Sequence, residues 1–439
     1  MTMDRLVVAD RGKFLMQENG EPFFWLGDTG WLLFSQLNKE QAEYYLEVRR
    51  QQGYNVIQVM GIHDLPIKNV YGSEPFIDND VGKPLLLNDP AHEGYWEHVD
   101  DIIKIAEQKG LYLAIVPVWG SVVKAGKVSV KQAEAYGTWL GKRYCNSPNI
   151  IWLNGGDIRG DVYPEVWDAL AQSIKAVDKN HLMTFHPFGR TQSSTWFHNR
   201  SWLDFNMFQS GHRRYDQIDK DGENLFGEDN WRFVKIDYTK QPPKPTIDGE
   251  PSYELIPQGL HDPSEPWWQA ADVRRYAYWS VFAGAFGHTY GHSSVMQMHS
   301  KDRLVGDYGA KKYWDEAIFD EGAKQMQYLK NLILAYPFFT RIPDQSVLAS
   351  EQGERYERVV ITRGNDYLFA YSYTGRQFDL HLGVIKGKQV KAFWYDPRTG
   401  VRTELCVLKN SGTASFDPPG EHVDGNDWVL ILETMYNND

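Results

Sequence analysis

The chain has very little cysteine and no long apolar segment. Among its 439 residues, only Cys145 and Cys406 are cysteines, and they lie far apart, so neither a disulfide framework nor a clustered thiolate metal site is expected. No run of about 18 apolar residues occurs, as a membrane helix would need, and residues 1–12 lack an apolar signal segment. For the compartment we favour the cytoplasm, with periplasm and secretion left open.

Positive charge is also scarce. Lys and Arg number 46 against 58 Asp and Glu, which gives a net charge of -12, and no dense basic stripe interrupts this balance. Such a chain repels phosphate backbones and anionic lipids. We therefore expect neither nucleic acid nor a membrane as a partner.

Aromatic residues, by contrast, are abundant. They make up 14% of the chain, with 16 Trp and 25 Tyr. Their flat side chains suit the stacking of sugar rings. The length allows one large domain and one small one, so the composition favours a two-domain protein that binds carbohydrate.

Eight short apolar runs alternate with amphipathic helical stretches. This alternation is typical of parallel strands joined by crossover helices, and eight such units predict an α/β fold of the (β/α)8 TIM barrel type. A doubly wound open sheet is the competitor, but it should have a Gly-rich phosphate loop after its first strand, which residues 27–30 do not form. The runs are residues 23–28, 55–61, 112–118, 150–157, 182–188, 205–210, 245–250 and 286–290.

Helix signals occur between these runs. Asn38 is placed to cap a helix that ends at Gln52, and Gly53 follows it. Further helices are predicted over residues 95–109, 164–177 and 315–334.

The chain changes character near residue 340. Short segments with period-two patterning and Gly-rich turns follow, which predicts a small all-β sandwich domain. We therefore divide the chain into a catalytic barrel, residues 1–340, and a β-sandwich, residues 341–439, that packs against the barrel and stabilises it. The expected strands are residues 359–362, 367–373, 378–382, 390–395 and 428–433.

Two carboxylates stand where a barrel places its chemistry, at the C-terminal ends of strands. Hydrolysis of a sugar acetal needs a proton donor and a nucleophile or base, roles usually filled by two Asp or Glu residues. Asp157 ends the fourth run and Glu250 the seventh, which resembles a large superfamily of retaining glycosidases with this barrel. The structural alternatives are a helix N-cap for Asp157 and an ion pair at the rim for Glu250, with Glu254 as a second choice of nucleophile.

Four segments of the sequence indicate a more specific resemblance, to one family. FFWLGDTGWLLF (23–34), WLNGGD (152–157), TIDGEPSYE (246–254) and RRYAYWSVFAGAFGHTYG (274–291) are together similar to the apiosidase-like family, family 140 of the glycoside hydrolases, whose β-sandwich bears a collagen-binding name. The resemblance implies retaining removal of a terminal apiose-type sugar from plant pectin, with Asp157 as acid/base and Glu250 as nucleophile.

The sequence departs from the broader superfamily at strand four, where a Glu usually follows Asn directly. Here Asn154 is followed by Gly155-Gly156-Asp157. Because Asp is one methylene shorter than Glu, we expect the two glycines to bring the backbone inward.

Ten further residues near strand ends are candidates for substrate binding. Their alternatives are an Asx-turn for Asp28 and simple filling of the barrel mouth for Trp119 and Tyr290, although Tyr290 could also orient Glu250. The histidines lack the HxH or HExxH spacing of metal ligands, so no metal or other cofactor is predicted. The candidates are Asp28, His63, Asp64, Trp119, Asn154, His186, Gln209, His212, Tyr290 and His292.

The substrate is therefore expected to be an oligosaccharide. Residues 62–93 and 211–244 are predicted to be long loops that wall in one sugar. The side chains expected to do so are His63, Asp64, Tyr71, Phe76, His212, Arg213, Arg214, Tyr215, Asp216 and Trp231. For a retaining enzyme the two carboxyl groups should lie roughly 5 to 5.5 Å apart. The rival hypotheses are an inactive barrel that binds carbohydrate or collagen, and a metal-dependent barrel hydrolase.

Overall fold

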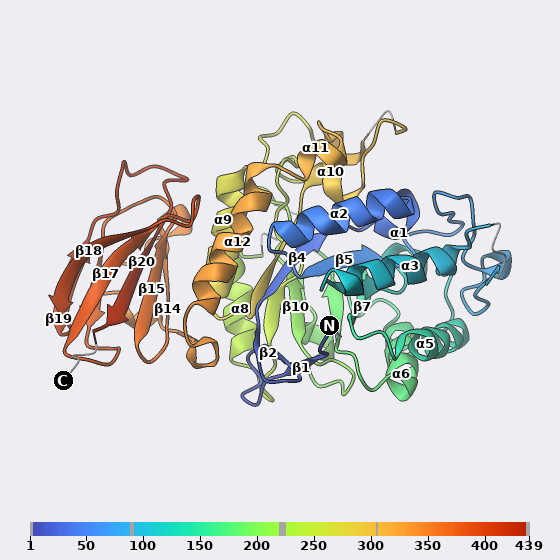
Figure 1. Cartoon of the computed structure of the whole chain (residues 1–439), viewed down its shortest axis with the longest axis horizontal. Helices are drawn as coiled ribbons and strands as arrows, with labels where there is room; N and C mark the ends of the chain where they lie inside the picture. The colour runs from blue at the N-terminus through green and yellow to red at the C-terminus, as the bar shows by residue number, and fades with distance from the viewer. Residues whose placement is uncertain (1–2, 88–91, 219–224, 304–305, 436–439) are drawn as a thin grey trace.

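The computed structural model describes residues 3–87, 92–218, 225–303 and 306–435. Parallel strands surrounded by helices form the larger part, and an antiparallel sheet domain forms the C-terminal part (Figure 1). No helix in the described ranges has the length and apolar character needed to cross a membrane.

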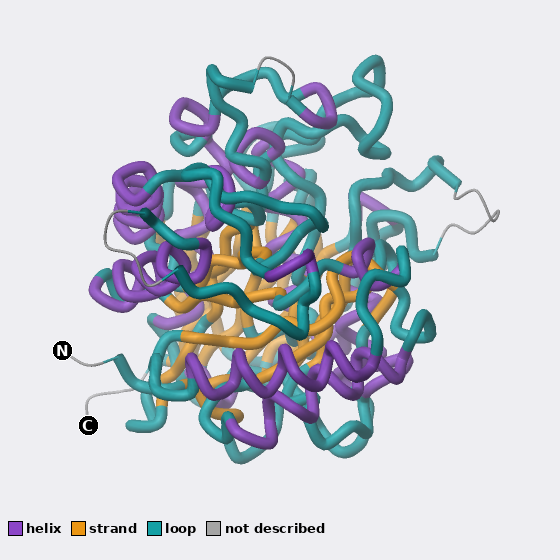
Figure 2. Tube along the Cα trace, turned by 90° about the vertical axis from the view of Figure 1, so that its right-hand side faces the viewer, coloured by secondary structure: helices purple, strands orange, loops and turns teal. Residues whose placement is uncertain are grey.

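The eight predicted barrel strands are present and form a closed ring. Six are hydrogen-bonded in the order β12-β4-β5-β6-β7-β8, and β10 pairs in parallel with β11. Main-chain bonds close the ring, from Asp204 N–H to Met183 O (2.8 Å) and from Phe286 N–H to Thr246 O (3.1 Å). Figure 2 shows the strands in the middle of the molecule with helices around them. The strands are β4 (Trp25–Thr29), β5 (Val56–Met60), β6 (Tyr112–Val116), β7 (Ile150–Ile158), β8 (Met183–Pro187), β10 (Asn206–Gln209), β11 (Thr246–Asp248) and β12 (Gly287–Tyr290).

Side chains alternate between the interior of the barrel and the surrounding helices. In β6, Tyr112 and Ala114 belong to the interior core, whereas Leu113 and Ile115 pack against the outer helices. This period of two is the geometry of any strand, and it decides which strand residues can reach the barrel mouth. A small N-terminal sheet, β1 (Leu6–Val8), β2 (Leu15–Gln17) and β3 (Pro22–Phe23), adds apolar side chains to the interior core.

The predicted helices are largely confirmed, and the first has the expected cap. Asn38 accepts a hydrogen bond from Gln41 N–H, and the Gln41 side chain accepts one from Asn38 N–H, which forms a capping box. The helices of the barrel region are α1 (Leu33–Gln36), α2 (Lys39–Gln51), α3 (Tyr95–Gln108), α4 (Gly120–Lys124), α5 (Val130–Tyr144), α6 (Pro164–Val177), α7 (Ser194–Phe197), α8 (Asn230–Tyr238), α9 (Ala270–Phe282), α10 (Ser293–Met296), α11 (Trp314–Ala317) and α12 (Glu321–Leu334).

Two predictions for this region were wrong. The helix expected over residues 315–334 is broken into α11 and α12, because the Ile318 carbonyl accepts hydrogen bonds from the side chains of Arg49 and Gln52 and Asp320 begins a new helix. The loop expected over residues 211–244 contains α8, whose Phe233 and Val234 are buried in a cluster with Phe208 of β10.

The C-terminal part is an antiparallel β-sandwich of unequal sheets. A six-stranded sheet has the order β13-β14-β15-β20-β17-β18, and β16 pairs with β19 to form the second sheet. The five expected strands are present, whereas β18 and β19 were not predicted, because their mostly exposed side chains show little apolar alternation. The strands are β13 (Ile342–Pro343), β14 (Val359–Arg363), β15 (Tyr367–Ser372), β16 (Phe378–Leu382), β17 (Gln389–Tyr395), β18 (Arg402–Lys409), β19 (Gly412–Phe416) and β20 (Trp428–Thr434).

The large sheet of this sandwich packs against the barrel. Helices α9 and α12 lie between the barrel strands and the C-terminal sheet (Figure 1). The Tyr278 ring of α9 stacks on Tyr371 of β15 with a centroid distance of 4.8 Å. Because α12 ends at Leu334 and β13 begins at Ile342, the predicted division at residue 340 falls in the connection between the two parts.

Candidate active site

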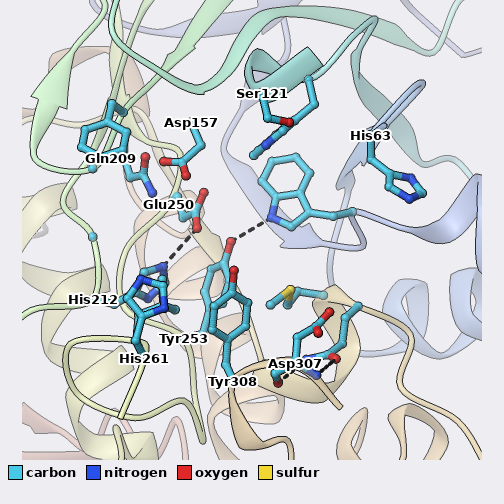
Figure 3. A pocket seen from close by; sticks show the side chains of 18 of the residues that line it. His63, Ser121, Asp157, Gln209, His212, Glu250, Tyr253, His261, Asp307 and Tyr308 are labelled. Carbon is cyan, nitrogen blue, oxygen red and sulfur yellow. Dashed lines mark hydrogen bonds and ion pairs between the residues drawn. The ribbon is translucent and has the colours of Figure 1, made fainter. Parts of the chain in front are cut away.

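A pocket of about 490 Å³ opens where the barrel strands end (Figure 3). This volume is within the range of about 300–1,000 Å³ that is typical of small-molecule sites. Both candidate catalytic carboxylates, Asp157 and Glu250, line it. Figure 3 shows their carboxyl groups next to each other on one side of the pocket, with His63 on the other side.

Asp157 reaches the pocket through an irregularity in β7. Gly155, Gly156 and Asp157 have φ values of +87°, +103° and +50°, and the pairing of β7 with β8 shifts between Gly155 and Ile158. A β-bulge of this kind turns a side chain that would otherwise follow the alternation of the strand. A Cβ on Gly156 would lie 2.4 Å from the Trp119 ring, so the second glycine is required by both its φ and its neighbour.

The environment of Asp157 favours its protonated form. The side chain is open to the pocket, but protein atoms crowd the carboxyl group. This desolvation, assisted by the negative charge of Glu250 and opposed by His186, His212 and Gln209, raises the pKa of Asp157 to about 6.

Glu250 has the opposite electrostatics. Burial alone would raise the pKa of its carboxyl group, but hydrogen bonds and positive charge from His186 and His212 outweigh burial and lower the pKa to about 2. The Nε2 atom of His212 lies 3.0 Å from Glu250 Oε1, and the Nε2 atom of His186 lies 3.2 Å from Oε2. Each carboxylate oxygen therefore lies next to one imidazole, and the contact with His212 has the geometry of a hydrogen bond.

His186 lies between the two candidate carboxylates. Asp157 N–H donates to His186 Nδ1 at 3.4 Å, so Nδ1 is an acceptor. The Nε2 atom on the other side of the ring lies 3.2 Å from Glu250 Oε2. One imidazole therefore contacts the backbone of Asp157 on one side and the carboxylate of Glu250 on the other.

The structure brings together six of the twelve predicted site residues as pocket-lining residues, and a seventh in contact with two of them. The six are Asp157, Glu250, His63, Trp119, Gln209 and His212. The seventh, His186, is fully buried and contacts the backbone amide of Asp157 and the carboxylate of Glu250.

Three predicted sugar contacts lie outside the pocket because their side chains alternate toward the helices. Asp28 is fully buried and accepts hydrogen bonds from Tyr45 Oη (2.5 Å) and Arg49 Nε (2.6 Å) of α2. Asn154 donates through Nδ2 to Trp167 O of α6 (2.9 Å). Tyr290, the third, is fully buried on the same outer side of the ring.

Tyr290 does not orient Glu250. Its hydroxyl donates to Glu254 Oε2 at 2.6 Å, and Glu254 Oε1 accepts from Gly322 N–H at 3.1 Å. Glu254, the second choice of nucleophile, is therefore occupied at a helix N-terminus and does not line the pocket.

The other two misplaced candidates belong to surface and capping contacts. Asp64 is exposed and pairs with Lys127 at 3.3 Å. His292 caps α10 by accepting from Ser294 N–H through Nδ1, and its Nε2 lies 3.0 Å from Asp320 Oδ2.

The walls of the pocket come only in part from the expected loops, which contribute His63, His212 and Arg213. Phe76 is buried in the helix-facing core, and neither Tyr71 nor Trp231 lines the pocket. Other aromatic and positively charged side chains that line the pocket come from the loops after β4, β8, β11 and β12. The lining residues that the sequence analysis missed include Trp31, Phe188, Arg190, Tyr253, His261, Arg303 and Tyr308.

Tyr253 is a pocket residue that the sequence analysis missed, and it contacts His212, the partner of Glu250. It lies three residues after Glu250, accepts a hydrogen bond from Trp31 Nε1–H at 3.0 Å, and contacts the His212 ring edge-on with a centroid distance of 4.6 Å. The segment TIDGEPSYE contains it, so the signal was present in the sequence. In the described part of the chain, no group of three or more His, Cys, Asp or Glu residues is arranged to hold a metal ion.

Comparison with known proteins shows the family of the chain. A family model described as "Apiosidase-like, catalytic domain" matches residues 9–340, and one described as "Putative collagen-binding domain of a collagenase" matches residues 342–433. A search of curated proteins gives no match.

Solved structures give two close relatives. A protein named "Glycoside hydrolase" is 53% identical, with a TM-score of 0.95, covering 98% of this chain and 97% of its own. A glycoside hydrolase family 5 protein from Bacteroides vulgatus ATCC 8482 is 50% identical, with a TM-score of 0.94, covering 98% of this chain and 93% of its own. With both carboxylates in one pocket of the matched barrel, the chain belongs to the apiosidase-like family and is a glycoside hydrolase.

Proposed function

We propose that the chain is a retaining exo-glycosidase that releases a terminal apiose-like sugar from a plant cell-wall, pectin-type oligosaccharide. Glu250 is the nucleophile and Asp157 the acid/base. The observation that supports these roles best is the pair of carboxyl groups in one pocket whose pKa values are pushed apart, to about 6 for Asp157 and about 2 for Glu250.

This separation sets the protonation states for the first step. Between pH of about 2 and 6, Glu250 is ionised while Asp157 is mainly protonated. A Glu250 oxygen attacks the anomeric carbon, the glycosidic bond breaks, and Asp157 gives its proton to the leaving oxygen. The two imidazoles on Glu250 hold the carboxylate in place, which reduces the reorganisation that the attack requires.

The second step reverses the role of Asp157. Once Glu250 is bonded to the sugar, it no longer has a negative charge. That charge is one of the causes that raise the pKa of Asp157, so the pKa falls in the intermediate. Asp157 is then a carboxylate that accepts a proton from water as the water attacks the anomeric carbon and releases Glu250.

The shape of the site favours a terminal sugar. Rings from several loops, among them Trp31, Trp119 and Tyr308, line the pocket together with polar groups, as in sites that enclose a small ligand. The choice of apiose depends on the description of the matching family model.

Product analysis tests this proposal. The full chain is incubated with apiose-bearing pectin side chains, and released sugars are followed by chromatography. Single apiose residues from chain ends fit the proposal, whereas an early drop in polymer length with mixed oligosaccharides contradicts exo action. Binding without any release would favour the inactive binding barrel, and loss of release on chelation would favour the metal-dependent hydrolase.

A further inference from the structure

We propose a second carbohydrate site, specific for a sugar that bears a carboxylate, between the loop after β10 and the C-terminal domain. A cavity of about 590 Å³ lies there, separate from the catalytic pocket. The barrel contributes Tyr215, Phe226, Trp231 and Arg232, and the C-terminal domain contributes Arg355 and Arg358.

The cavity concentrates positive charge in a chain whose net charge is -12. Arg358 lies over the Trp231 ring at 3.5 Å, and Arg355 over the Tyr215 ring at 5.0 Å. Neither arginine forms a salt bridge with any residue that the structure describes, and Arg358 Nε is a buried donor without an acceptor. An unpaired buried donor is costly, and a bound anion would remove that cost.

The nearby acidic residues offset the charge of these two arginines only from a distance: Asp229 acts electrostatically on Arg358 and Asp216 on Arg355, but the salt bridges of Asp229 and Asp216 are with Arg232 and Arg214. Asp229 accepts hydrogen bonds from Tyr215 Oη and from Arg232 Nε (2.9 Å), so its carboxylate is already used. Glu354 also lines the cavity and is exposed. Arg355 and Arg358 are therefore the cations available to a ligand, and guanidinium groups bind carboxylates with paired hydrogen bonds.

The position of the cavity indicates an oligosaccharide rather than a free anion, an assignment that rests on the proposed function for the choice of a sugar. Arg213 lines the catalytic pocket, and Tyr215 lines the second cavity. Two residues of chain span at most about 7 Å, so the two cavities lie on either side of one short segment. On this proposal, a substrate whose terminal sugar occupies the pocket continues past this segment, and its neighbouring acidic sugars contact the arginines.

Calorimetric titration of the full chain tests the second site directly. The probes are a galacturonate trisaccharide, the same trisaccharide with its carboxyl groups reduced to alcohols, and inorganic phosphate at equal ionic strength. We expect the acidic trisaccharide alone to bind, with affinity that falls as NaCl rises. R355Q and R358Q should each weaken it at least about tenfold, while R11Q, an exposed arginine of the N-terminal hairpin, should not change it.

Several outcomes would overturn the second site. Unchanged affinity in R355Q and R358Q would place any binding elsewhere, including the catalytic pocket. Equal affinity for the neutral trisaccharide would remove the role of the carboxylate, and equal affinity for phosphate would remove the sugar. Arg355 is exposed, so R355Q is informative even if R358Q lowers the melting temperature. Because binding is measured without turnover, the result is independent of the roles proposed for Asp157 and Glu250.

Discussion

At the scale of single residues, the site consists of two carboxyl groups held in opposite states by their neighbours. Glu250 has an imidazole on each oxygen. Asp157 has crowding and a nearby negative charge. The surroundings of Glu250 therefore stabilise its ionised form, and those of Asp157 stabilise its protonated form.

Replacing Glu250 tests the nucleophile. Glu250→Gln keeps the size of the side chain but removes the charge that attacks the anomeric carbon, so kcat should fall more than about 10³-fold while Kd for substrate changes little. Rapid-quench kinetics and calorimetry measure the two quantities. Glu254→Gln is the matched control, since Glu254 lies four residues after Glu250 and does not line the pocket. Near-normal kcat in Glu250→Gln, together with loss of kcat in Glu254→Gln, would make Glu254 the nucleophile instead.

The pH dependence tests the acid. A raised pKa of about 6 means that Asp157 is protonated below pH 6 and loses its proton above it. We therefore expect kcat/KM to fall about tenfold per pH unit above 6 and to stay level down to the region of Glu250 protonation near 2, as far as the fold permits. Asp157→Asn should lower kcat/KM about 10²–10⁴-fold on natural substrates and abolish the fall in kcat/KM above pH 6. If this fall persists in Asp157→Asn, another group is the acid.

At the scale of elements, strand alternation explains what the sequence could and could not give. The runs of apolar residues located all eight barrel strands, and the cap at Asn38 located α2. The carboxylates were found because β7 and β11 end at the mouth. Asp28, Asn154 and Tyr290 were wrongly predicted to line the pocket. They lie near strand ends, but their side chains point toward the outer helices, and the predicted strand boundaries alone do not determine which side of a strand each residue faces.

Several of the residues that loops contribute to the pocket could not be placed from the sequence, although His63 and His212 were. Tyr308 and His261 come from segments after β12 and β11 whose paths depend on packing between distant elements. Local patterns contain no information on such contacts. The broken helix at Ile318 has the same origin, because its cause is a pair of side chains from α2.

The bulge in β7 gives a test at this scale. In Gly156→Ala, the new Cβ would meet the Trp119 ring in addition to adopting an unfavourable positive φ, so Asp157 should be displaced and kcat/KM should fall at least about tenfold. Gly110→Ala is the control, since Gly110 also has a positive φ but no atom within 4 Å of the added Cβ. It should cost about 1–2 kcal/mol of stability from φ alone and leave kcat/KM unchanged. Equal activity in both variants would contradict the role given to the bulge.

At the scale of the whole molecule, the C-terminal domain is joined to the barrel by a buried ion pair. Arg274 of α9 donates to both oxygens of Asp427, at 2.9 and 2.8 Å, and both residues are buried. Tyr371 Oη also donates to Asp427 at 3.1 Å. Removing one partner of such a pair leaves the other charge buried without compensation.

Asp427→Asn should therefore destabilise the protein by about 3–5 kcal/mol, measured as a lower melting temperature and a lower urea midpoint. Glu404→Gln removes an exposed ion pair with Lys391 and should cost no more than about 1 kcal/mol. Equal effects of the two substitutions would show that the domain interface contributes little to the stability of the protein.

Binding of collagen by residues 341–439 alone would show that the domain has a role other than stabilising the barrel.

The central claim is a double displacement at Glu250, and the configuration of the product tests it most directly. The full chain acts on an apiose-bearing pectin side chain in the presence of methanol, which captures the sugar as a methyl glycoside whose configuration no longer changes in solution. Nuclear magnetic resonance then reads the anomeric configuration. Two displacements, each of which inverts the anomeric carbon, predict a methyl glycoside with the configuration of the substrate. The opposite configuration would contradict the account.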